Sequence, residues 1–442
     1  MASRKITRRR FIGGAAAAAT AFTIVPAYVL GNNGRTPPSE KLNVAGIGVG
    51  GQGAADLDDI AGNNDVNVVA LCDVDENRAR DSFSKYPQAK KYHDFRVMLE
   101  KEKSNIDAVI VATPDHVHAL AAMMALKMGK HVYCEKPLTH SVYEARQLAK
   151  VARETGLATQ MGNQAHANEE LKLSVEVIKM GLIGKVGEVH AWSDRPIWPQ
   201  GIDRPKDTPA VPESLQWDLW LGPAPERPYH PAYLPFSWRG WWDFGTGALG
   251  DMGCHIIDPV VWALDLGSPT SVEAVSTKVN SETAPVASIV RYEFPARGEL
   301  PPVKLTWWDG HLLPPRPEEM EDQRKFPDNG VLYIGDKGKI LAAHGSAPRL
   351  LPEERMKDFR KPEAQLPRGV GHRREWINAC KGGPKPLSNF EYAGPLSELV
   401  LLGNVALRTG QKIYWDGPGL KVSNVAEADQ YIRREYRSGW TL

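Results

Sequence analysis

Short apolar runs alternate with helical patterns over the stretch that begins near residue 42. The runs at 42–47, 66–71 and 108–112 are nearly continuous and rich in β-branched residues, which is typical of strands buried on both faces of a parallel sheet. Between and after them, apolar positions at 117–128 and 142–155 recur at helical spacing. This alternation predicts an α/β domain with a doubly wound parallel sheet over residues 42–164.

The pattern changes in the second part of the chain, residues 165–442. Four segments alternate apolar and polar positions, as strands with one buried face do: 186–193, 272–279, 287–294 and 303–308. Few helical patterns separate the last three, so we expect an α+β domain with a large, mostly antiparallel open sheet. The Pro-rich stretch 198–235 predicts an ordered excursion, and 312–328 and 345–370 predict loops.

The first thirty residues have the composition of an export signal. Arg8, Arg9 and Arg10 precede Phe11 in a twin-arginine pattern, and an Ala-rich apolar run follows to about Leu30. Residues 31–41 contain two prolines and little apolar surface, which predicts a linker. We therefore expect the twin-arginine export machinery to be a partner, and a periplasmic or otherwise exported protein.

Composition and charge restrict the kinds of partner that we expect for this chain. The formal net charge is +1, from 54 basic and 53 acidic residues, which gives no reason to expect a nucleic acid partner. Beyond residue 30 no apolar stretch approaches the ~20 residues of a membrane span. The four cysteines lie far apart without metal-ligand spacing, so we expect packed free thiols and no metal site: Cys72, Cys134, Cys254 and Cys380.

A glycine-rich loop follows the first predicted strand. Gly48, Gly50 and Gly53 form a G-x-G-x-x-G pattern, with Gly51 and Gln52 between the last two and a helix predicted from about residue 52. In this pattern the glycines allow a tight turn, close approach of the backbone to a pyrophosphate, and packing of helix on strand. Asp73 ends the next strand about twenty residues later, where a carboxylate accepts hydrogen bonds from ribose hydroxyls and repels a 2′-phosphate. We expect NAD, with NADP less favoured.

Two further groups of residues follow strands at the same edge of the predicted sheet. Thr113, Pro114, His116 and His118 come after the third strand, and a helix beginning near Asp115 would present its amino end to the cofactor. A metal at the two histidines is disfavoured, since histidine near a helix start more often caps or packs. Glu135 and Lys136 come after strand 131–134, and Pro137 restricts Lys136 to an extended conformation. Lysine beside nicotinamide can bind a substrate hydroxyl or stabilise negative charge on oxygen, although most lysines are solvated surface residues.

Four motifs together resemble one enzyme family. The glycine loop, ATPDHVHA at 112–119, EKP at 135–137 and GALGDMGCHIID at 247–258 are similar in order and spacing to the glucose–fructose oxidoreductase, inositol dehydrogenase and MocA (Gfo/Idh/MocA) family. The resemblance covers about residues 41 to 415. It implies a Rossmann domain, a second domain whose open sheet often forms the oligomer interface, and a catalytic group made of Lys136, Asp251 and His255.

The spacing of the last motif agrees with that implication. Asp251 and His255 are four residues apart and Asp258 is seven from the first, so a helix would carry all three on one face. A carboxylate one turn from a histidine can orient its ring, and histidine suits removal of a hydroxyl proton. The alternative is a buried helix whose Asp and His only satisfy one another.

Two more segments suggest a sugar-like substrate. Asn163, Gln164 and His166 follow another strand-like stretch and could bind a polyol. Arg239, Trp241 and Trp242 precede the candidate catalytic helix, and aromatic faces beside charged groups suit a sugar ring. Tryptophan is also common in cores and subunit interfaces, so both interpretations stay open.

Three functions remain. The first is an NAD-dependent oxidoreductase that oxidises a secondary hydroxyl of a saccharide or polyol. The second is a redox-neutral glycoside hydrolase that oxidises, eliminates, adds water and reduces again, as the resemblance to NAD-using N-acetylhexosaminidases suggests. The third is a non-catalytic sugar-binding relative, which the intact Lys136, Asp251 and His255 disfavour. Export away from the cytoplasmic coenzyme pool favours tightly bound NAD, and the resemblance implies a homo-oligomer formed through the second sheet.

Overall fold

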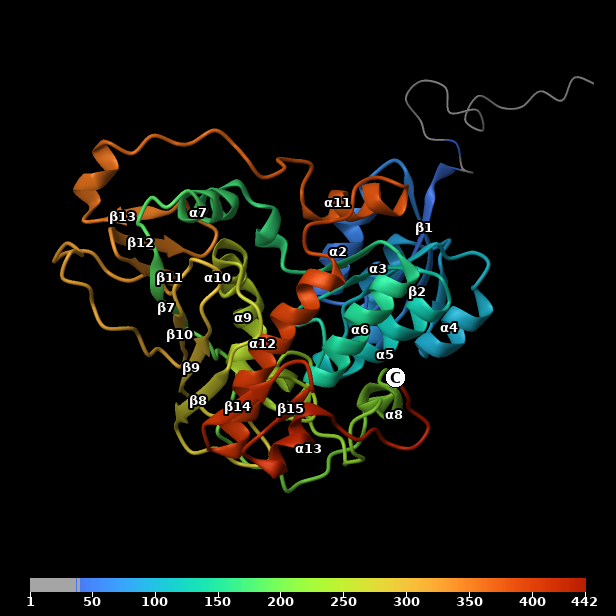
Figure 1. The fold of residues 1–442 in the computed structure, drawn as a ribbon. Helices are drawn as coiled ribbons and strands as arrows, with labels where there is room; N and C mark the ends of the chain where they lie inside the picture. The colour runs from blue at the N-terminus through green and yellow to red at the C-terminus, as the bar shows by residue number, and fades with distance from the viewer. Residues whose placement is uncertain (1–36, 38–39) are drawn as a thin grey trace, which may run out of the picture.

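A six-stranded parallel sheet forms the first half of the computed structural model, which describes residue 37 and residues 40–442 (Figure 1). The predicted leader and nearly all of the linker lie outside the described residues. The strand order is β3-β2-β1-β4-β5-β6, which is that of a Rossmann fold and confirms the predicted doubly wound sheet. The strands are β1 (Leu42–Ile47), β2 (Val66–Cys72), β3 (Lys90–Tyr92), β4 (Ala108–Val111), β5 (His131–Cys134) and β6 (Thr159–Met161).

Helices alternate with these strands because each crossover between parallel strands needs one. They are α2 (Gln52–Ala61), α3 (Glu76–Lys85), α4 (Phe95–Lys101), α5 (Asp115–Lys127) and α6 (Val142–Thr155). Their ends have local causes. Ser141 and Glu144 form a reciprocal capping box at the start of α6, and Gly156 ends that helix in the left-handed conformation. The crossovers leave every β–α loop at the carboxyl edge of the sheet, where the glycine loop and the EKP segment meet.

The second sheet has nine strands in the order β13-β12-β11-β7-β10-β9-β8-β14-β15. Only the β7–β10 pair is parallel, so the predicted mostly antiparallel open sheet is confirmed. The strands are β7 (Val186–Ser193), β8 (Ser271–Ser276), β9 (Ser288–Phe294), β10 (Val303–Trp308), β11 (Asn329–Gly335), β12 (Gly338–Ala343), β13 (Arg349–Leu351), β14 (Ile413–Asp416) and β15 (Lys421–Val422).

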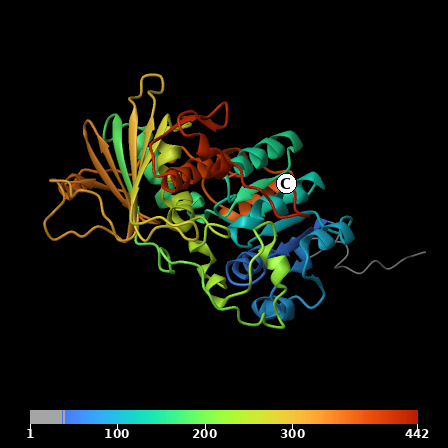
Figure 2. The same ribbon diagram turned by 90° about the horizontal axis from the view of Figure 1, so that it is seen from below.

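Helices cover one face of this sheet, which stands at one side of the molecule in Figure 2. They include α7 (Glu169–Lys179), α9 (Gly247–Ile256), α10 (Asp258–Leu264) and α12 (Phe390–Thr409). Helix α12 contacts both α6 and strand β8, so it joins the two halves through one shared core. On the opposite face, Trp192, Leu332 and Leu341 form a small cluster beneath Met320 of the predicted loop 312–328.

Two segments depart from the predicted organisation. Helix α11 (His372–Cys380) belongs to the second half in sequence, yet it packs on α2 and inserts Trp376 beneath the first sheet. The loop predicted at 345–370 contains the short strand β13 and a 3-10 turn. The four cysteines are free thiols, as predicted, and Cys72, Cys134 and Cys254 are buried. Within the described part of the chain, no helix combines the length and apolarity that a membrane crossing requires.

The helix predicted over Asp251, His255 and Asp258 is in fact two helices. Helix α9 ends at Ile256 and α10 begins at Asp258, followed by Pro259, which cannot continue a preceding helix. The Asp258 carboxylate has different partners from that of Asp251. It accepts hydrogen bonds from Asn163 Nδ2 at 3.0 Å and Tyr392 Oη at 2.5 Å, and lies 2.9 Å from His166 Nδ1.

We expect Asp258→Ala to lower stability rather than to change the chemistry. The substitution leaves several buried donors unpaired, each costing about 1–3 kcal/mol, so the free energy of unfolding should fall by roughly 3 kcal/mol or more. Urea unfolding followed by tryptophan fluorescence measures this loss, with the exposed carboxylate variant Glu154→Ala as control. A variant that is fully stable but inactive would instead give Asp258 a part in the reaction.

Candidate active site

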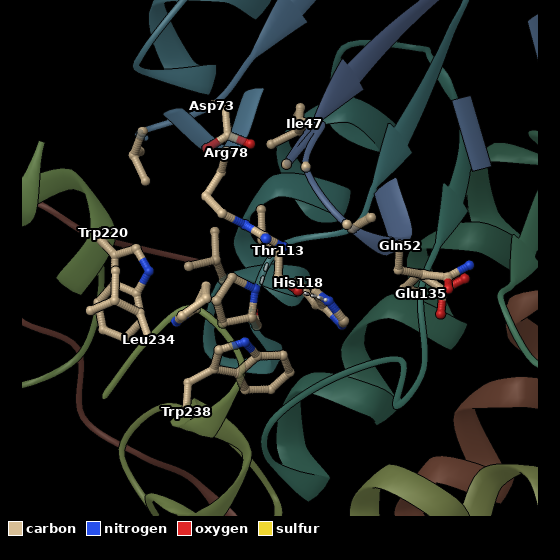
Figure 3. Close-up of a pocket in the computed structure, with 18 of the residues that line it drawn as sticks. Ile47, Gln52, Asp73, Arg78, Thr113, His118, Glu135, Trp220, Leu234 and Trp238 are labelled. Atoms are coloured by element: carbon tan, nitrogen blue, oxygen red, sulfur yellow. Dashed lines mark hydrogen bonds between the residues drawn. The ribbon is translucent and has the colours of Figure 1, made fainter. Parts of the chain in front are cut away.

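A cavity of about 590 Å³ opens at the carboxyl edge of the first sheet. Both halves of the chain line it. The first half contributes the glycine loop and the loops that follow β2, β4 and β5, and the second contributes the 198–246 stretch and helix α9. Figure 3 shows Asp73 and Arg78 from the first half, with Trp220 and Trp238 from the second. Ligands bind in this position in open α/β sheets.

The glycine loop fits a dinucleotide. Gly48 has a φ of 76°, and a Cβ there would lie 2.7 Å from the carbonyl oxygen of Ala112. A Cβ on Gly53 would lie 1.8 Å from the carbonyl oxygen of Gly48, so only glycine lets α2 begin this close to β1. Gly48, Gly50, Gly51 and Gln52 line the cavity, whereas Gly53 packs beneath them. This cradle leaves backbone amides at the start of α2 available to a pyrophosphate.

Asp73 lies at the cavity end that faces β2 and β3. Its carboxylate accepts hydrogen bonds from the backbone amides of Val49 at 2.9 Å and Asp75 at 3.0 Å. Burial raises its pKa above the ordinary 3.8, although these amides act in the opposite direction. Arg78 also lines the cavity and extends beside Gly51, where its guanidinium could face a phosphate. Arg78 was not anticipated from the sequence, since an arginine in the first turn of a helix is a common surface residue.

The middle of the cavity is formed by the segment after β4. Thr113, Pro114 and His118 line it, and His118 Nε2 lies 2.7 Å from the carbonyl oxygen of Thr113 (Figure 3). His116 does not line it. The two ring nitrogens of His116 lie 3.2 Å and 3.1 Å from the carbonyl oxygens of Phe244 and Trp220, and burial lowers its pKa to about 3. The prediction that His116 contacts the cofactor therefore needs correction, because this side chain ties the second half of the chain to α5.

Lys136, Asp251 and Arg239 form the charged centre of the cavity. Lys136 Nζ donates to Asp251 Oδ1 at 2.7 Å and to the carbonyl oxygen of Asp251 at 2.9 Å. Arg239 Nε donates to the same Oδ1 at 3.0 Å. Burial disfavours a charged Asp251, but the two cations outweigh it and lower its pKa to about 2. Asp251 therefore stays ionised and fixes both cationic side chains at the cavity wall.

His255 lies one turn further along α9 and lines the same cavity. Burial, followed by the charge of Lys136, lowers its pKa well below the ordinary 6.5, which keeps the imidazole neutral. Its Nδ1 is buried without a hydrogen-bond partner among the described residues. The expected contact with Asp251 is absent from this part of the chain, because Asp251 faces the two cations. The ring of His344 lies 5.5 Å away between centroids.

Glu135 and Gln164 form a second polar pair at the cavity. Gln164 Nε2 donates to Glu135 Oε1 at 2.7 Å, and both side chains line the cavity. Burial, and then the nearby charge of Asp56, raises the pKa of Glu135 well above the ordinary 4.5. The space is tight, since a Cβ on Gly162 would lie 2.2 Å from Glu135 Oε1.

The other residues predicted from the QMGNQAH segment lie elsewhere. Asn163 is fully buried, where it donates to Asp258 and accepts from Ser388 Oγ at 2.6 Å. His166 stacks on Trp262 with ring centroids 4.1 Å apart and faces Asp258. Neither lines the cavity, so the expectation that they bind a polyol needs correction. Polar residues after a strand suggested a site, but here they satisfy a buried carboxylate.

The aromatic residues that line the cavity are not the two that the sequence predicted. Trp241 is fully buried and donates from Nε1 to the carbonyl oxygen of Ala232 at 3.1 Å, and Trp242 donates to that of Asn280 at 3.1 Å. Neither lines the cavity, which corrects the expectation that they stack on a sugar. Other aromatic side chains of the 198–246 stretch do line it: Trp198, Trp220, Phe236 and Trp238. The Arg239 guanidinium lies 4.3 Å from the Trp238 ring centroid, so this wall combines apolar faces with a fixed charge.

Comparisons with known proteins agree with this architecture. Residues 42–163 match the model of the GFO_IDH_MocA oxidoreductase family with an NAD-binding Rossmann fold, and residues 175–298 match the model of its C-terminal alpha/beta domain. The WlbA dehydrogenase from Bordetella pertussis, solved with NADH and UDP-GlcNAcA, superposes with a TM-score of 0.60 at 18% identity. That match covers 85% of this chain and 99% of the other, and it shows the shared fold.

Curated relatives match over shorter stretches. A glycosyl hydrolase family 109 protein of Stenotrophomonas maltophilia is 29% identical over 195 residues, which cover 42% of this chain and 41% of the relative. An inositol 2-dehydrogenase of Salmonella typhimurium is 29% identical over 147 residues, which cover 33% of this chain and 43% of the relative. The chain thus spans about half the length, or less, of the curated relatives it matches.

Proposed function

Because this chain belongs to the Gfo/Idh/MocA family of NAD-binding oxidoreductases, we propose that it oxidises a secondary hydroxyl of a saccharide or polyol with NAD as the acceptor. The observation that carries the proposal is the meeting of Lys136, Asp251 and His255 at one cavity that also contains the glycine loop. The solved relative in complex with a sugar nucleotide and the inositol dehydrogenases support a carbohydrate or polyol as the substrate class.

The three residues have complementary parts in this proposal. The neutral His255 accepts the hydroxyl proton, which its lowered pKa allows at neutral pH. Lys136 donates to the hydroxyl oxygen and stabilises negative charge on it as the carbonyl forms. Asp251 positions the Lys136 ammonium through the 2.7 Å contact. Arg239 and the aromatic wall around Trp238 hold the sugar against this group.

The residues of the first half would hold the cofactor. The glycine loop accommodates the pyrophosphate, Asp73 the ribose hydroxyls, and Thr113, Pro114, His118 and Glu135 the remaining part. NAD supplies a hydride acceptor when it is bound. The Asp73 carboxylate supports a preference for NAD over NADP, since it would repel a 2′-phosphate; the neighbouring Arg78 makes a direct comparison of the two necessary.

A redox-neutral glycoside hydrolase is the second candidate. The family 109 glycosyl hydrolase among the relatives favours it. In this reaction, transient oxidation of the sugar to a ketone acidifies the neighbouring C–H, the glycosidic group leaves by elimination, water adds, and the hydride returns to carbon. The same Lys136 and His255 would hold the oxygen and move its proton in both directions. No net reduced cofactor forms.

The sequence supports two further parts of the proposal, which are export of the protein and association of its copies. The twin-arginine leader supports export of the folded protein, which makes a cofactor that stays bound an advantage. The resemblance to the family supports association of copies through the nine-stranded sheet. Light scattering of the purified protein measures the association of copies, and localisation of a tagged full-length chain measures export.

A panel of free sugars, polyols and aryl glycosides distinguishes the candidate reactions. The protein is incubated first without and then with added NAD. Formation of reduced nicotinamide that depends on a free sugar or polyol is the expected result. Release of the aryl group without net reduction would favour the hydrolase, and sugar-induced quenching of tryptophan fluorescence with no reaction would favour a binding protein.

A further inference from the structure

The last segment of the described chain, residues 433–442, reaches the cofactor cavity. It follows helix α13 (Asp429–Ile432) beside the second sheet and then runs to the side of the molecule where the first sheet lies, ending near α8 (Trp217–Leu221) (Figure 1). Trp440 lies on this segment, lines the cavity and is 8% exposed. We call residues 433–442 the closing segment.

Polar contacts hold the closing segment on helices α6 and α8 and on the turn that follows α8. Arg434 Nε and Tyr436 Oη each donate to Glu144 Oε1 on α6 at 2.8 Å. Arg437 Nε donates to the carbonyl oxygen of Gly222 at 3.1 Å, and its guanidinium pairs with Asp218 on α8. These contacts hold residues 434–437, and Lys127 Nζ donates to the carbonyl oxygen of Leu442 at 3.2 Å, so the segment lies on the surface as an ordered strap.

Trp440 occupies the end of the cavity that is remote from Lys136. Its ring centroid lies 6.0 Å from that of Phe95, which begins α4 after β3, and the Arg96 guanidinium lies 4.0 Å over the indole. In a Rossmann sheet of this strand order, the β1–β2–β3 half receives one mononucleotide and the β4–β5–β6 half the other. Asp73 and Phe95 follow strands β2 and β3, so they lie in the β1–β2–β3 half of the sheet. Trp440 therefore stands at the adenosine end.

We propose that the closing segment is part of the NAD site, with Trp440 as a wall of the adenine subsite and the segment as a strap that slows release of NAD. This inference rests on the proposed function only in that it takes the cavity to be the NAD site. An aromatic wall contacts adenine favourably because every base offers a π-face. A strap fixed at Glu144 and Asp218 restricts the space through which the adenosine moiety leaves. The cofactor then remains bound through successive turnovers.

Trp440→Ala tests the adenine wall. We expect NAD and ADP-ribose to bind roughly tenfold to a hundredfold more weakly to this variant, the range that loss of one base–aromatic contact produces. Nicotinamide mononucleotide, which lacks adenosine, should bind as it does to the unaltered protein. Isothermal titration and stopped-flow fluorescence of the apoprotein give affinity and release rate, and extraction of the purified protein gives the bound NAD per chain.

Three companion variants separate binding from folding. Trp415→Ala removes an indole of similar burial, 7% exposed, from strand β14 away from the cavity, and should leave the NAD affinity of the folded protein unchanged. Arg437→Ala loosens the strap without touching the indole, and should speed NAD release. Trp440→Phe keeps an aromatic wall and should restore most of the affinity.

The outcomes distinguish this inference from the proposed function. NAD affinity and release in Trp440→Ala equal to those of the unaltered protein would overturn the inference, and so would an equal loss of nicotinamide mononucleotide binding. Absence of sugar oxidation, together with the expected changes in NAD release, would overturn the proposed reaction and leave the inference standing. Failure of the unaltered protein to bind NAD would overturn both.

Discussion

Lys136→Met is expected to lower kcat/KM for the sugar or polyol by roughly a hundredfold to a thousandfold. A change of that size corresponds to about 2.7–4 kcal/mol of transition-state stabilisation, as removal of one oxyanion donor typically gives. The physical reason is the fixed position of the ammonium, which Asp251 holds at 2.7 Å in a buried site where a hydrogen bond to a charged oxygen is strong. Initial rates of reduced nicotinamide formation measure the loss.

The binding of NAD should separate this effect from a general disturbance. Asp251 keeps Arg239 as a partner at 3.0 Å, so we expect Lys136→Met to fold and to bind NAD within a few-fold of the unaltered protein. Lys150→Met, which removes an exposed lysine from α6, is the matched control and should change neither property. Full turnover in Lys136→Met would remove this residue from the reaction.

His255→Ala is expected to lower kcat/KM by roughly a hundredfold to ten-thousandfold, the range for loss of a positioned general base. The pH profile of the unaltered protein supplies the sharper test. Activity requires the neutral imidazole, and burial places its pKa below the ordinary 6.5, so activity should be flat above pH 6.5 and should fall only below it. After burial, the groups that influence the pKa of this ring are Lys136, His344, Asp251 and His372.

Two carboxyl groups near the site also titrate, and their pKa values separate their effects on the pH profile from that of His255. Asp251, with a pKa of about 2, stays ionised throughout and cannot produce the acid limb. Asp115 is buried beside Thr246, and burial raises its pKa to about 7, so its titration would produce a limb at higher pH. A limb near pH 7 that disappears in Asp115→Asn and persists in His255→Ala would contradict the assignment of His255 as the base.

Much of the first sheet, and the place of Gly48, Asp73 and Lys136 at the cavity on its edge, could be predicted because local sequence determines them. A turn that only glycine permits, as at Gly48, and a carboxylate at a strand end, as at Asp73, leave a pattern within about twenty-five residues. Lys136 follows a strand and precedes a proline, so its place at the sheet edge also follows from nearby residues. The order of such motifs then indicated the family and both sheets.

The residues that were misplaced depend on contacts between distant segments. Asn163 and His166 have the residue types of a binding site, but their side chains contact Asp258, over ninety positions away in the sequence. Asp251 and His255 do lie together on α9, whereas Asp258 begins α10, with Pro259 in its first turn. Trp440 lines the cavity although it lies near residue 442. The periodic pattern of apolar residues does not predict which part of the fold such a segment contacts.

The 198–246 stretch has a consequence for how this scaffold could acquire new substrates. Its aromatic side chains pack mostly on one another, in a cluster that includes Tyr233, Trp241 and Phe244, while Trp220 and Trp238 belong to that cluster and also line the cavity. Neither sheet supplies this wall. Under the proposed function, substitutions in this stretch would change which substrates fit the cavity, while the glycine loop and Lys136 at the edge of the first sheet keep their positions.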